Sequence, residues 1–493
     1  MAKTCKELFE GIPCTIMGNA DEVIEGIAYR SDCVRPGDVF CCIVGSQVDG
    51  HSFAQEAIDR GARVLVVERK MYLADATDVT EVMVRDSRKA MALIAARFYD
   101  NPYQNFDVVG ITGTSGKSTT TYLVDHMIAS FGYRTGLINS FGVSIADDHF
   151  PSANTTPESA DLQRLFAQMR DAHTKVVTME VSSHALDQRR TWGTAFTVTA
   201  FTNLTQEHLD YHKSFESYFE AKAQLFSQDY PSKRVINIDS SWGKEILRRI
   251  SAQGDDIVTT GFDQSAQIHP VHVEYGADET HVVLDVQGSS IEFSYPLVGR
   301  FNVENVMTAF GIGLTLGYPA SAIAQSFEDA PLIHGRLEHV KSDFSSGRDV
   351  YLDYAHTPDV LEKVIDSVKE LTSGKTIVVF GCADNLEQGK RPLMGKAALK
   401  ADYAFVTSAD FEGLASEEVL DACLSGKIED SDRVIAEPDR RRAIARAFSR
   451  ANEGDAILIA GGNVKRDRLQ KDAELLAQDR SVALAELEKV FNS

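Results

Sequence analysis

The stretch FDVVGITGTSGKSTTT, from Phe106 to Thr121, constrains the fold of this chain more than any other. An apolar run is followed by a glycine-rich loop and then by residues with helical apolar spacing, which predicts a strand, a loop and a helix in that order. This is the context of a phosphate-binding loop, although the usual spacing is broken: the position five residues before Gly116 holds Ile111 instead of glycine. The alternative interpretation is a flexible strand-to-helix turn.

The loop keeps every chemical part that a phosphate cradle needs. Its glycines allow backbone N–H groups to turn toward one anion, Lys117 adds a positive charge, and Ser118 offers a hydroxyl to a magnesium ion. We therefore predict nucleotide binding here. The candidate residues are Thr112, Gly113, Thr114, Ser115, Gly116, Lys117 and Ser118.

Strand-like and helix-like segments alternate along most of the chain, which predicts an α/β fold with parallel sheets covered by helices on both faces. At 493 residues the chain is too long for one hydrophobic core. We predict three domains: a small α/β domain at 1–104, a central P-loop ATPase-like domain at 105–334 and a Rossmann-like domain at 335–493. Period-two alternation at 265–297 predicts an antiparallel insertion.

Net charge limits which partners the protein can bind, and cysteine content indicates the redox state of its compartment. A formal charge of −22 argues against nucleic acid and anionic membranes, because their phosphates would be repelled. No stretch has the length of a membrane span or a signal peptide. Seven cysteines without C-x-x-C spacing favour a reducing cytoplasm, and adjacent Cys41 and Cys42 are interpreted as inert core thiols.

Two further residues follow apolar runs that resemble strands. Glu180 ends one run and His208 comes just after another, so both are expected at the carboxyl edge of a parallel sheet, where ligands bind. A carboxylate, an imidazole and the Ser118 hydroxyl form a reasonable set for a magnesium ion that bridges phosphates. For His208 a capping or core role is an equally good interpretation.

Together these residues carry a family resemblance. The chain resembles the Mur ligases, ATP-dependent enzymes that add amino acids to UDP-linked muramic acid, and within them the type E branch. The resemblance runs nearly end to end. The motifs that carry it are GTSGKSTT, NTTPES, MEVSSHALDQRR, FTNLTQEHLDYH, EAKAQLF, LVGRFNVENV, HGRLE, LDYAHTPD and GKRPLMG. The altered glycine spacing is the family's own variant of the loop.

The resemblance implies a role for each matching residue. Lys117, Glu180, His208 and Lys222 would be catalytic, and Ser118, Glu180, His208 and Lys222, the last as a carbamate, would hold Mg²⁺. ATP would also meet Asn302, Arg336, Asp353 and His356. The UDP-muramoyl-dipeptide would meet Ser31, Gln47, Thr155, Thr156, Ser182, Gln188 and Arg190.

The C-terminal third departs from the family pattern where the incoming amino acid is expected. Ala409-Asp410-Phe411-Glu412 replaces the Asp-Asn-Pro-Arg motif of diaminopimelate-adding members, and residues 383–386 and AGGNVKRD also differ. Glu412 in place of arginine would repel a distal carboxylate, whereas Asp410 and Glu412 would attract a plain basic side chain. Lys465 would instead attract a distal carboxylate, which favours diaminopimelate. Arg391 remains to hold the α-carboxylate of the incoming amino acid.

We therefore expect a cytoplasmic, monomeric ligase that uses an acyl phosphate to add L-lysine or another diamino acid to UDP-MurNAc-L-Ala-D-Glu. One alternative is a ligase that adds meso-diaminopimelate through an altered pocket. Another is a non-catalytic Mur-like subunit that binds nucleotide, and a generic P-loop kinase is the last. Release of phosphate that depends on both the dipeptide substrate and an amino acid would separate these hypotheses.

Overall fold

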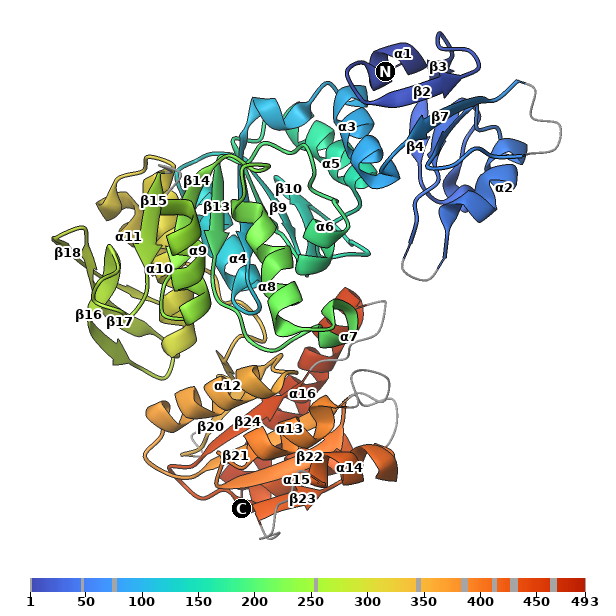
Figure 1. Cartoon of the computed structure of the whole chain (residues 1–493). Helices are drawn as coiled ribbons and strands as arrows, with labels where there is room; N and C mark the ends of the chain where they lie inside the picture. The colour runs from blue at the N-terminus through green and yellow to red at the C-terminus, as the bar shows by residue number, and fades with distance from the viewer. Residues whose placement is uncertain are drawn as a thin grey trace. The chain divides into compact units, whose positions relative to one another are not determined.

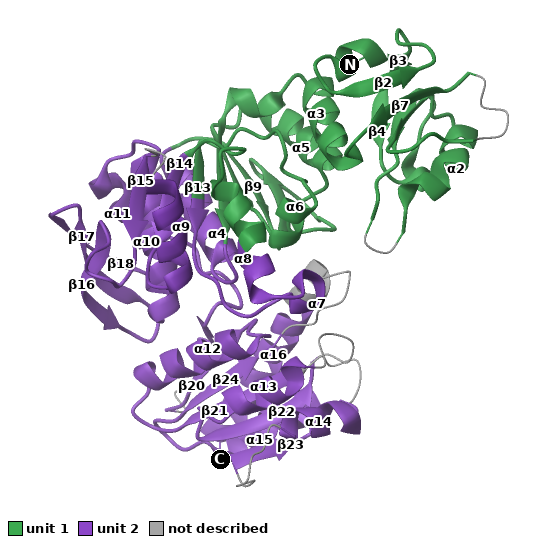
Figure 2. Ribbon diagram, viewed as in Figure 1, with its two compact units in different colours: residues 1–112, 132–199, 220–232 green, residues 113–131, 200–219, 233–493 purple. Residues whose placement is uncertain are grey.

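The computed structural model describes residues 2–45, 48–72, 78–251, 256–342, 347–382, 389–409, 415–425, 433–461 and 468–492. It separates into two compact units, each made of several segments of the chain (Figure 2). Unit 1 comprises residues 1–112, 132–199 and 220–232, and unit 2 comprises 113–131, 200–219 and 233–493. The division of the sequence into three domains stays a prediction.

The first sheet of unit 1 is formed by the beginning of the chain (Figure 1). Its order is β2 (Cys14–Met17), β7 (Thr80–Val84), β6 (Val64–Val67), β5 (Asp38–Cys41), β4 (Gly26–Ala28). All neighbours are parallel except β2 and β7. The other elements are β1 (Lys3–Thr4), β3 (Val23–Ile24), α1 (Cys5–Phe9), α2 (Ala54–Asp59) and α3 (Ser87–Phe98).

Both adjacent cysteines of this sheet lie in its core, as the sequence predicted. Cys41 and Cys42 have no exposed surface. Burial raises the pKa of the Cys42 thiol to about 12 and that of Cys41 further still, so neither ionises near neutral pH.

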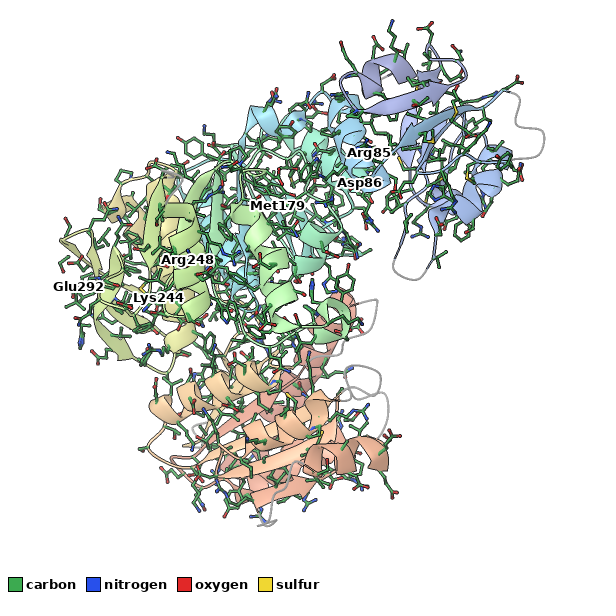
Figure 3. The ribbon with its side chains drawn as sticks, viewed as in Figure 1. Arg85, Asp86, Met179, Lys244, Arg248 and Glu292 are labelled. Atoms are coloured by element: carbon green, nitrogen blue, oxygen red, sulfur yellow. The ribbon has the colours of Figure 1, made fainter. Side chains whose placement is uncertain are left out.

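The second sheet of unit 1 begins with the strand that leads to the glycine-rich loop. These strands form one end of an 11-stranded sheet, in the order β11 (Asp148–Phe150), β10 (Gly142–Ile145), β9 (Thr135–Asn139), β12 (Val176–Glu180), β8 (Asp107–Thr112). Strand β12 runs parallel to both β8 and β9, with Glu180 level with Ile111. The labelled Met179 marks β12 in Figure 3. Its helices are α5 (Ser159–Asp171) and α6 (Ser183–Asp187).

The first half of unit 2 contains the loop helix α4 (Lys117–Ser130) and the predicted antiparallel insertion. The strands are β14 (Lys233–Asn237), β15 (Ile257–Thr260), β16 (Ile268–Tyr275), β17 (Thr280–Val286) and β18 (Ser289–Tyr295). Strands β16, β17 and β18 pair antiparallel, which confirms the prediction. Further elements are α7 (Leu209–His212), α9 (Ser241–Ser251), α10 (Arg300–Thr315) and α11 (Ala320–Glu328). Strand β13 (Val198–Phe201) and helix α8 (Phe215–Ala223) are each divided between the two units.

The last sheet lies in the second half of unit 2 and is parallel apart from its short first strand. Its order is β19 (Glu338–His339), β20 (Asp349–Asp353), β24 (Ala456–Ala460), β21 (Thr376–Cys382), β22 (Tyr403–Ser408), β23 (Val434–Ala436). The helices are α12 (Pro358–Leu371), α13 (Lys390–Ala398), α14 (Glu417–Leu424), α15 (Arg440–Arg450) and α16 (Arg468–Phe491).

Continuous apolar runs explain why this sheet is buried on both faces. Val378 and Phe380 belong to one core cluster together with residues of α12 and α13. Their neighbours Ile377 and Val379 are equally buried and point to the opposite face, because side chains alternate along a strand. The α/β fold class with helix-covered parallel sheets is confirmed.

Candidate active site

Two glycines of the phosphate loop are required by its geometry. Gly113 has φ +150° and Gly116 has φ +84°, a region that residues with a Cβ atom rarely adopt. A Cβ on Gly113 would lie 1.9 Å from Thr202 Oγ1, and one on Gly116 would lie 2.2 Å from Asn305 Oδ1. Both positions therefore need glycine for conformation and for space.

Hydrogen bonds to the segment after β13 fix the middle of the loop. The Ser115 amide donates to Asn203 Oδ1 at 2.9 Å, and Thr202 Oγ1 donates to the Ser115 carbonyl at 2.7 Å. The Thr114 hydroxyl accepts from the Thr205 amide at 3.0 Å. The chain itself thus holds the backbone of the loop in one conformation.

Lys117 begins helix α4 and turns back over the loop. Its ammonium donates to the carbonyl oxygens of Gly113 at 2.9 Å and of Thr114 at 2.7 Å. The side chain of the next residue, Ser118, is buried in the first turn. A lysine and the first amides of a 14-residue helix are the groups that an anion site needs, and binding of nucleotide phosphates here stays a prediction.

Helix α10 supports the loop through two buried asparagines. Asn302 Nδ2 donates to the Val298 carbonyl at 2.9 Å, and Asn305 Nδ2 donates to Asn302 Oδ1 at 3.1 Å. Asn305 is the residue that the glycine at 116 leaves room for. The predicted residue Asn302 therefore connects to the loop through Asn305, which the sequence analysis missed.

A carboxylate missed by the sequence analysis lies between two predicted histidines. The Glu207 carboxylate is 3.6 Å from His208 Nε2 and 3.8 Å from His356 Nε2. Burial alone would raise the pKa of Glu207, but His356, His208 and Lys117 together hold it well below its usual range. His208 itself has φ +58°, which is uncommon outside glycine and typical of functional sites. The only signal in the sequence was the position of Glu207 beside His208.

Arg336 and Asp353 lie near the carboxyl end of strand β20 in the C-terminal sheet. Asp353 ends β20, is buried, and accepts a hydrogen bond from the Leu337 amide at 2.8 Å. Burial raises the pKa of Asp353 to about 6, although Arg336 opposes this shift. The Arg336 guanidinium is centred 5.7 Å from the Tyr354 ring, and His356 Nδ1 lies 2.8 Å from the Tyr354 carbonyl.

In unit 1, hydrogen bonds connect Glu180 to several residues predicted to bind the muramoyl-dipeptide. The Thr156 hydroxyl donates to the Glu180 carbonyl at 2.8 Å and accepts from the Ser182 amide at 3.1 Å. The Glu180 carboxylate accepts from the Ser140 amide at 2.9 Å, and the Ser140 hydroxyl lies 3.2 Å from Thr155 Oγ1. Four predicted residues thus form one network.

An arginine pair extends this network toward a cavity. Arg190 donates to the Thr156 carbonyl at 2.9 Å and to Gln188 Oε1 at 2.8 Å. The Glu158 carboxylate pairs with Arg190 at 3.0 Å and with Arg88 at 3.3 Å. Arg88 and Glu158, absent from the prediction, line a cavity of about 350 Å³ together with Ser31. Helix α3, which carries Arg88, is capped by the labelled Asp86, the ion-pair partner of Arg189 (Figure 3).

Models of one enzyme family match three parts of this chain. Residues 23–99 match "Mur ligase family, catalytic domain", 111–313 match "Mur ligase middle domain", and 335–463 match "Mur ligase, glutamate ligase domain". A relative from Clostridium botulinum (strain ATCC 19397 / Type A) is 37% identical over 93% of this chain and 94% of its own length. The chain belongs to the Mur ligase family.

The relatives share one printed name. The C. botulinum protein and one from Aquifex aeolicus (strain VF5), 37% identical over 89% of this chain and 88% of its own length, are each called "UDP-N-acetylmuramoyl-L-alanyl-D-glutamate--2,6-diaminopimelate ligase". A solved structure of a protein with that name has a TM-score of 0.69 and 27% identity, over 98% of this chain and 99% of its own. The predicted family and its type E branch are confirmed, and the chain is an amino-acid-adding ligase.

The predicted magnesium set of this Mur ligase is divided between the units. Glu180 and Lys222 belong to unit 1, while Ser118 and His208 belong to unit 2, so their common role stays a prediction. The Lys222 side chain is only 1% exposed. An ammonium and a carbamate are both charged, and both cost free energy to bury without a partner, so the carbamate stays a prediction.

The predicted amino-acid site of the Mur ligase is only partly described. Arg391, in the first turn of α13, is 4% exposed and lies 3.9 Å from Glu418. Asp410, Glu412 and Lys465, like Gln47 of the sugar-nucleotide set and residues 383–386, lie outside the described residues. Among the helices of the described ranges, none combines the length and apolar character that a bilayer span requires.

Proposed function

We propose that the protein is an ATP-dependent ligase that joins 2,6-diaminopimelate to the D-glutamate of UDP-MurNAc-L-Ala-D-Glu. The observation that carries this proposal is the full-length similarity to ligases named for that reaction. The loop geometry supports an ATP substrate, because Lys117 lies over the loop at the beginning of helix α4, and a helix N-terminus with a lysine favours an anion. A monomeric, cytoplasmic enzyme fits this role.

The unit 1 network supports the sugar-nucleotide half of the proposal. The cavity beside Ser31 is lined by Arg30 and Arg88, two cations that can bind a diphosphate if they leave their present partners in the same lining, Asp32 and Glu158. From there the Arg88–Glu158–Arg190 chain leads to Thr156 and Ser182. These groups would bind the muramoyl-dipeptide and orient its terminal carboxylate.

The reaction then requires two substitutions. The dipeptide carboxylate oxygen attacks the γ-phosphorus of ATP, the bond to ADP breaks, and an acyl phosphate forms. The amine nitrogen attacks the acyl carbon, phosphate leaves with the bonding electron pair, and the amine loses one proton. Lys117 and the loop amides hold the phosphate charge in place, which is the main contribution a protein makes to phosphoryl transfer.

Magnesium would shield the phosphate charges during this transfer, and the family resemblance indicates which residues would hold the ion. Ser118, Glu180, His208 and a Lys222 carbamate would supply oxygen and nitrogen donors. The carbamate is what the family resemblance implies at Lys222, which is buried. A Lys222→Ala variant is expected to lose activity that bicarbonate does not restore.

The third amino acid is the point at which sequence and relatives disagree. The residues at 409–412 favour lysine or ornithine, whereas the relatives are named for 2,6-diaminopimelate. We give the relatives more weight, because they extend over most of the chain and the argument for lysine rests on two side chains. An altered pocket would then bind the distal carboxylate through other groups, Lys465 being one candidate.

A panel of amino acids tests the proposal. Purified protein with ATP, Mg²⁺ and UDP-MurNAc-L-Ala-D-Glu should release phosphate when meso-diaminopimelate is added and much less with lysine or ornithine. Stimulation by lysine alone would overturn the choice of amino acid but keep the ligase. No stimulation by any amino acid, with ATP still bound, would favour a non-catalytic nucleotide-binding subunit.

A further inference from the structure

A buried ion pair in the second half of unit 2 also contacts the backbone of the sheet. Arg440, the first residue of α15, is 1% exposed, and Asp479 on α16 is 2% exposed. Arg440 Nε lies 2.8 Å from Asp479 Oδ1, and Nη2 lies 2.7 Å from Oδ2. Two parallel hydrogen bonds of this kind fix the plane of the guanidinium group.

The same guanidinium reaches two strand ends. Nη1 donates to the Ser408 carbonyl at 3.2 Å, and Nη2 donates to the Ala460 carbonyl at 3.3 Å. Ser408 is the last residue of β22 and Ala460 the last of β24. These strands are not neighbours, because β21 runs between them. Arg440 therefore sets the spacing of two strand ends across a third strand.

Close packing at the intervening strand shows that this spacing is tight. A Cβ on Gly381, near the end of β21, would lie 2.3 Å from the Ser408 carbonyl oxygen and 2.6 Å from Ala409 Cα. On the other side, the Gly461 amide donates to the Asp353 carbonyl at 3.1 Å. Four strand ends at the carboxyl edge are thus connected to one another.

This edge is where ligands of open parallel sheets bind, and the buried Arg391 follows β21 there. We propose that the Arg440–Asp479 pair positions the carboxyl edge of this sheet for the incoming amino acid. Arg440 does not touch that substrate; it acts through the ends of β22 and β24. The inference rests on the proposed function and names the part of the chain that sets affinity for the amino acid.

Stability alone is a weak explanation for this pair. A buried ion pair can often be replaced by apolar side chains of similar volume without loss of stability. What apolar side chains cannot replace is the fork of donors that holds two carbonyl oxygens at once. Arg440→Lys keeps the charge beside Asp479 but removes this fork, so it separates positioning from pairing.

The chain offers a matched control at the opposite edge of the same sheet. Asp455, 5% exposed, accepts from the Lys375 amide at 2.7 Å and the Asn452 amide at 2.8 Å, and so connects the beginnings of β21 and β24. Asp455→Asn should lower the thermal unfolding midpoint as Arg440→Lys does. Its effect on the amino-acid site should be absent.

The experiment compares Arg440→Lys, Asp479→Asn and Asp455→Asn with the unmodified protein in the phosphate-release assay. We expect Arg440→Lys and Asp479→Asn to raise KM for the amino acid about tenfold, while KM for ATP and for UDP-MurNAc-L-Ala-D-Glu changes less than about twofold. Asp455→Asn should leave all three KM values within about twofold.

Two results would overturn the inference. One is an unchanged amino-acid KM in Arg440→Lys protein that remains folded; the other is an equal rise of all three KM values. If Arg440→Lys does not fold, Asp479→Asn alone decides, because it keeps the arginine and its carbonyl contacts but weakens their anchor. Loss of amino-acid-dependent phosphate release in the unmodified protein would refute the proposed function instead.

Discussion

The phosphate loop and the carboxyl edge of the C-terminal sheet both lie at the carboxyl ends of parallel strands. Different kinds of contact fix their conformations. The loop is held by hydrogen bonds to its backbone from Asn203, Thr202 and Lys117, and Asn305 occupies the space beside Gly116. The C-terminal edge is fixed by buried ionisable groups, namely Asp353, Arg391 and the Arg440–Asp479 pair.

This difference follows from what each edge is expected to bind. A phosphate is the same in every nucleotide and can be held by backbone amides, so the loop needs glycines and polar supports. An amino acid must be distinguished from others by charge and shape, so its site needs charged groups and a defined spacing. Changes in the loop should therefore affect ATP, and changes at Arg391 or at the Arg440–Asp479 pair should affect the amino acid. Asp353 differs from these residues, because the family resemblance assigns it to ATP.

The largest expected effect is that of Lys117→Ala. Lys117 is the only lysine in the first turn of α4, and its ammonium group contacts two loop carbonyls. The variant therefore leaves the charge of a bound phosphate without this cation. We expect phosphate release to fall about 10²–10³-fold. Lys244→Ala, which removes an exposed lysine on α9 (Figure 3), should keep the activity within about twofold. Equal losses in the two variants would contradict the assignment.

Arg391→Gln should impair binding of the amino acid and leave binding of ATP unchanged, the reverse of a change in the phosphate loop. If this buried cation holds the α-carboxylate, its removal loses a charge-assisted contact, and KM for the amino acid should rise about 10–100-fold. KM for ATP should change little. Lys396→Gln, at an exposed position of the same helix, is the control. A rise in KM for ATP as large as that for the amino acid would remove the distinction between the edges.

The supports of the loop can be tested with two glycines of similar backbone conformation. Gly116 has φ +84° and Gly132 has φ +81°, but only a Cβ at 116 would meet another atom, Asn305 Oδ1. Gly132→Ala should cost about 1–2 kcal/mol of unfolding free energy from backbone strain alone. Gly116→Ala should cost about 3 kcal/mol and also raise KM for ATP. Equal losses of unfolding free energy in the two variants would mean that the clash with Asn305 does not affect stability.

The sequence predicted the loop better than the C-terminal edge for a physical reason. The strand, glycines, lysine and serine of the loop are consecutive, so their order alone reveals the chemistry. Glu207 and Asn305 were missed because their roles depend on residues distant in sequence: Glu207 gains its role from His356 and Asn305 from the space at Gly116. The only local signal was that Glu207 precedes His208. Arg440 is still less visible, since its partners Ser408, Ala460 and Asp479 lie 20 or more residues away.

The fold shows the same limit. Alternating segments indicated parallel sheets, and period-two alternation located β16 to β18 correctly. The strand order β20-β24-β21-β22 could not be derived, because it places the last strand of the chain between two earlier ones. Contacts such as that from Arg440 to both Ser408 and Ala460 depend on this order.

The smallest expected effect concerns Asp353, where stability and activity should change in opposite directions. Burial raises the pKa of Asp353 to about 6, so the folded protein binds a proton there more tightly than the unfolded chain does. As pH rises toward and through 6, ionisation of this buried carboxyl costs free energy, and its contribution to stability is lost. Asp353→Asn cannot ionise and avoids that loss.

The stability difference between the unmodified protein and Asp353→Asn should therefore depend on pH. Urea unfolding should show the unmodified protein losing about 1–2 kcal/mol relative to the variant between pH 5 and pH 8. Phosphate release by the variant should nevertheless fall, because the Asp353 charge next to Arg336 is gone. A difference that is constant with pH would show that Asp353 ionises as easily in the folded protein as in the unfolded chain. In that case Asp353 would no longer distinguish the C-terminal edge from the phosphate loop.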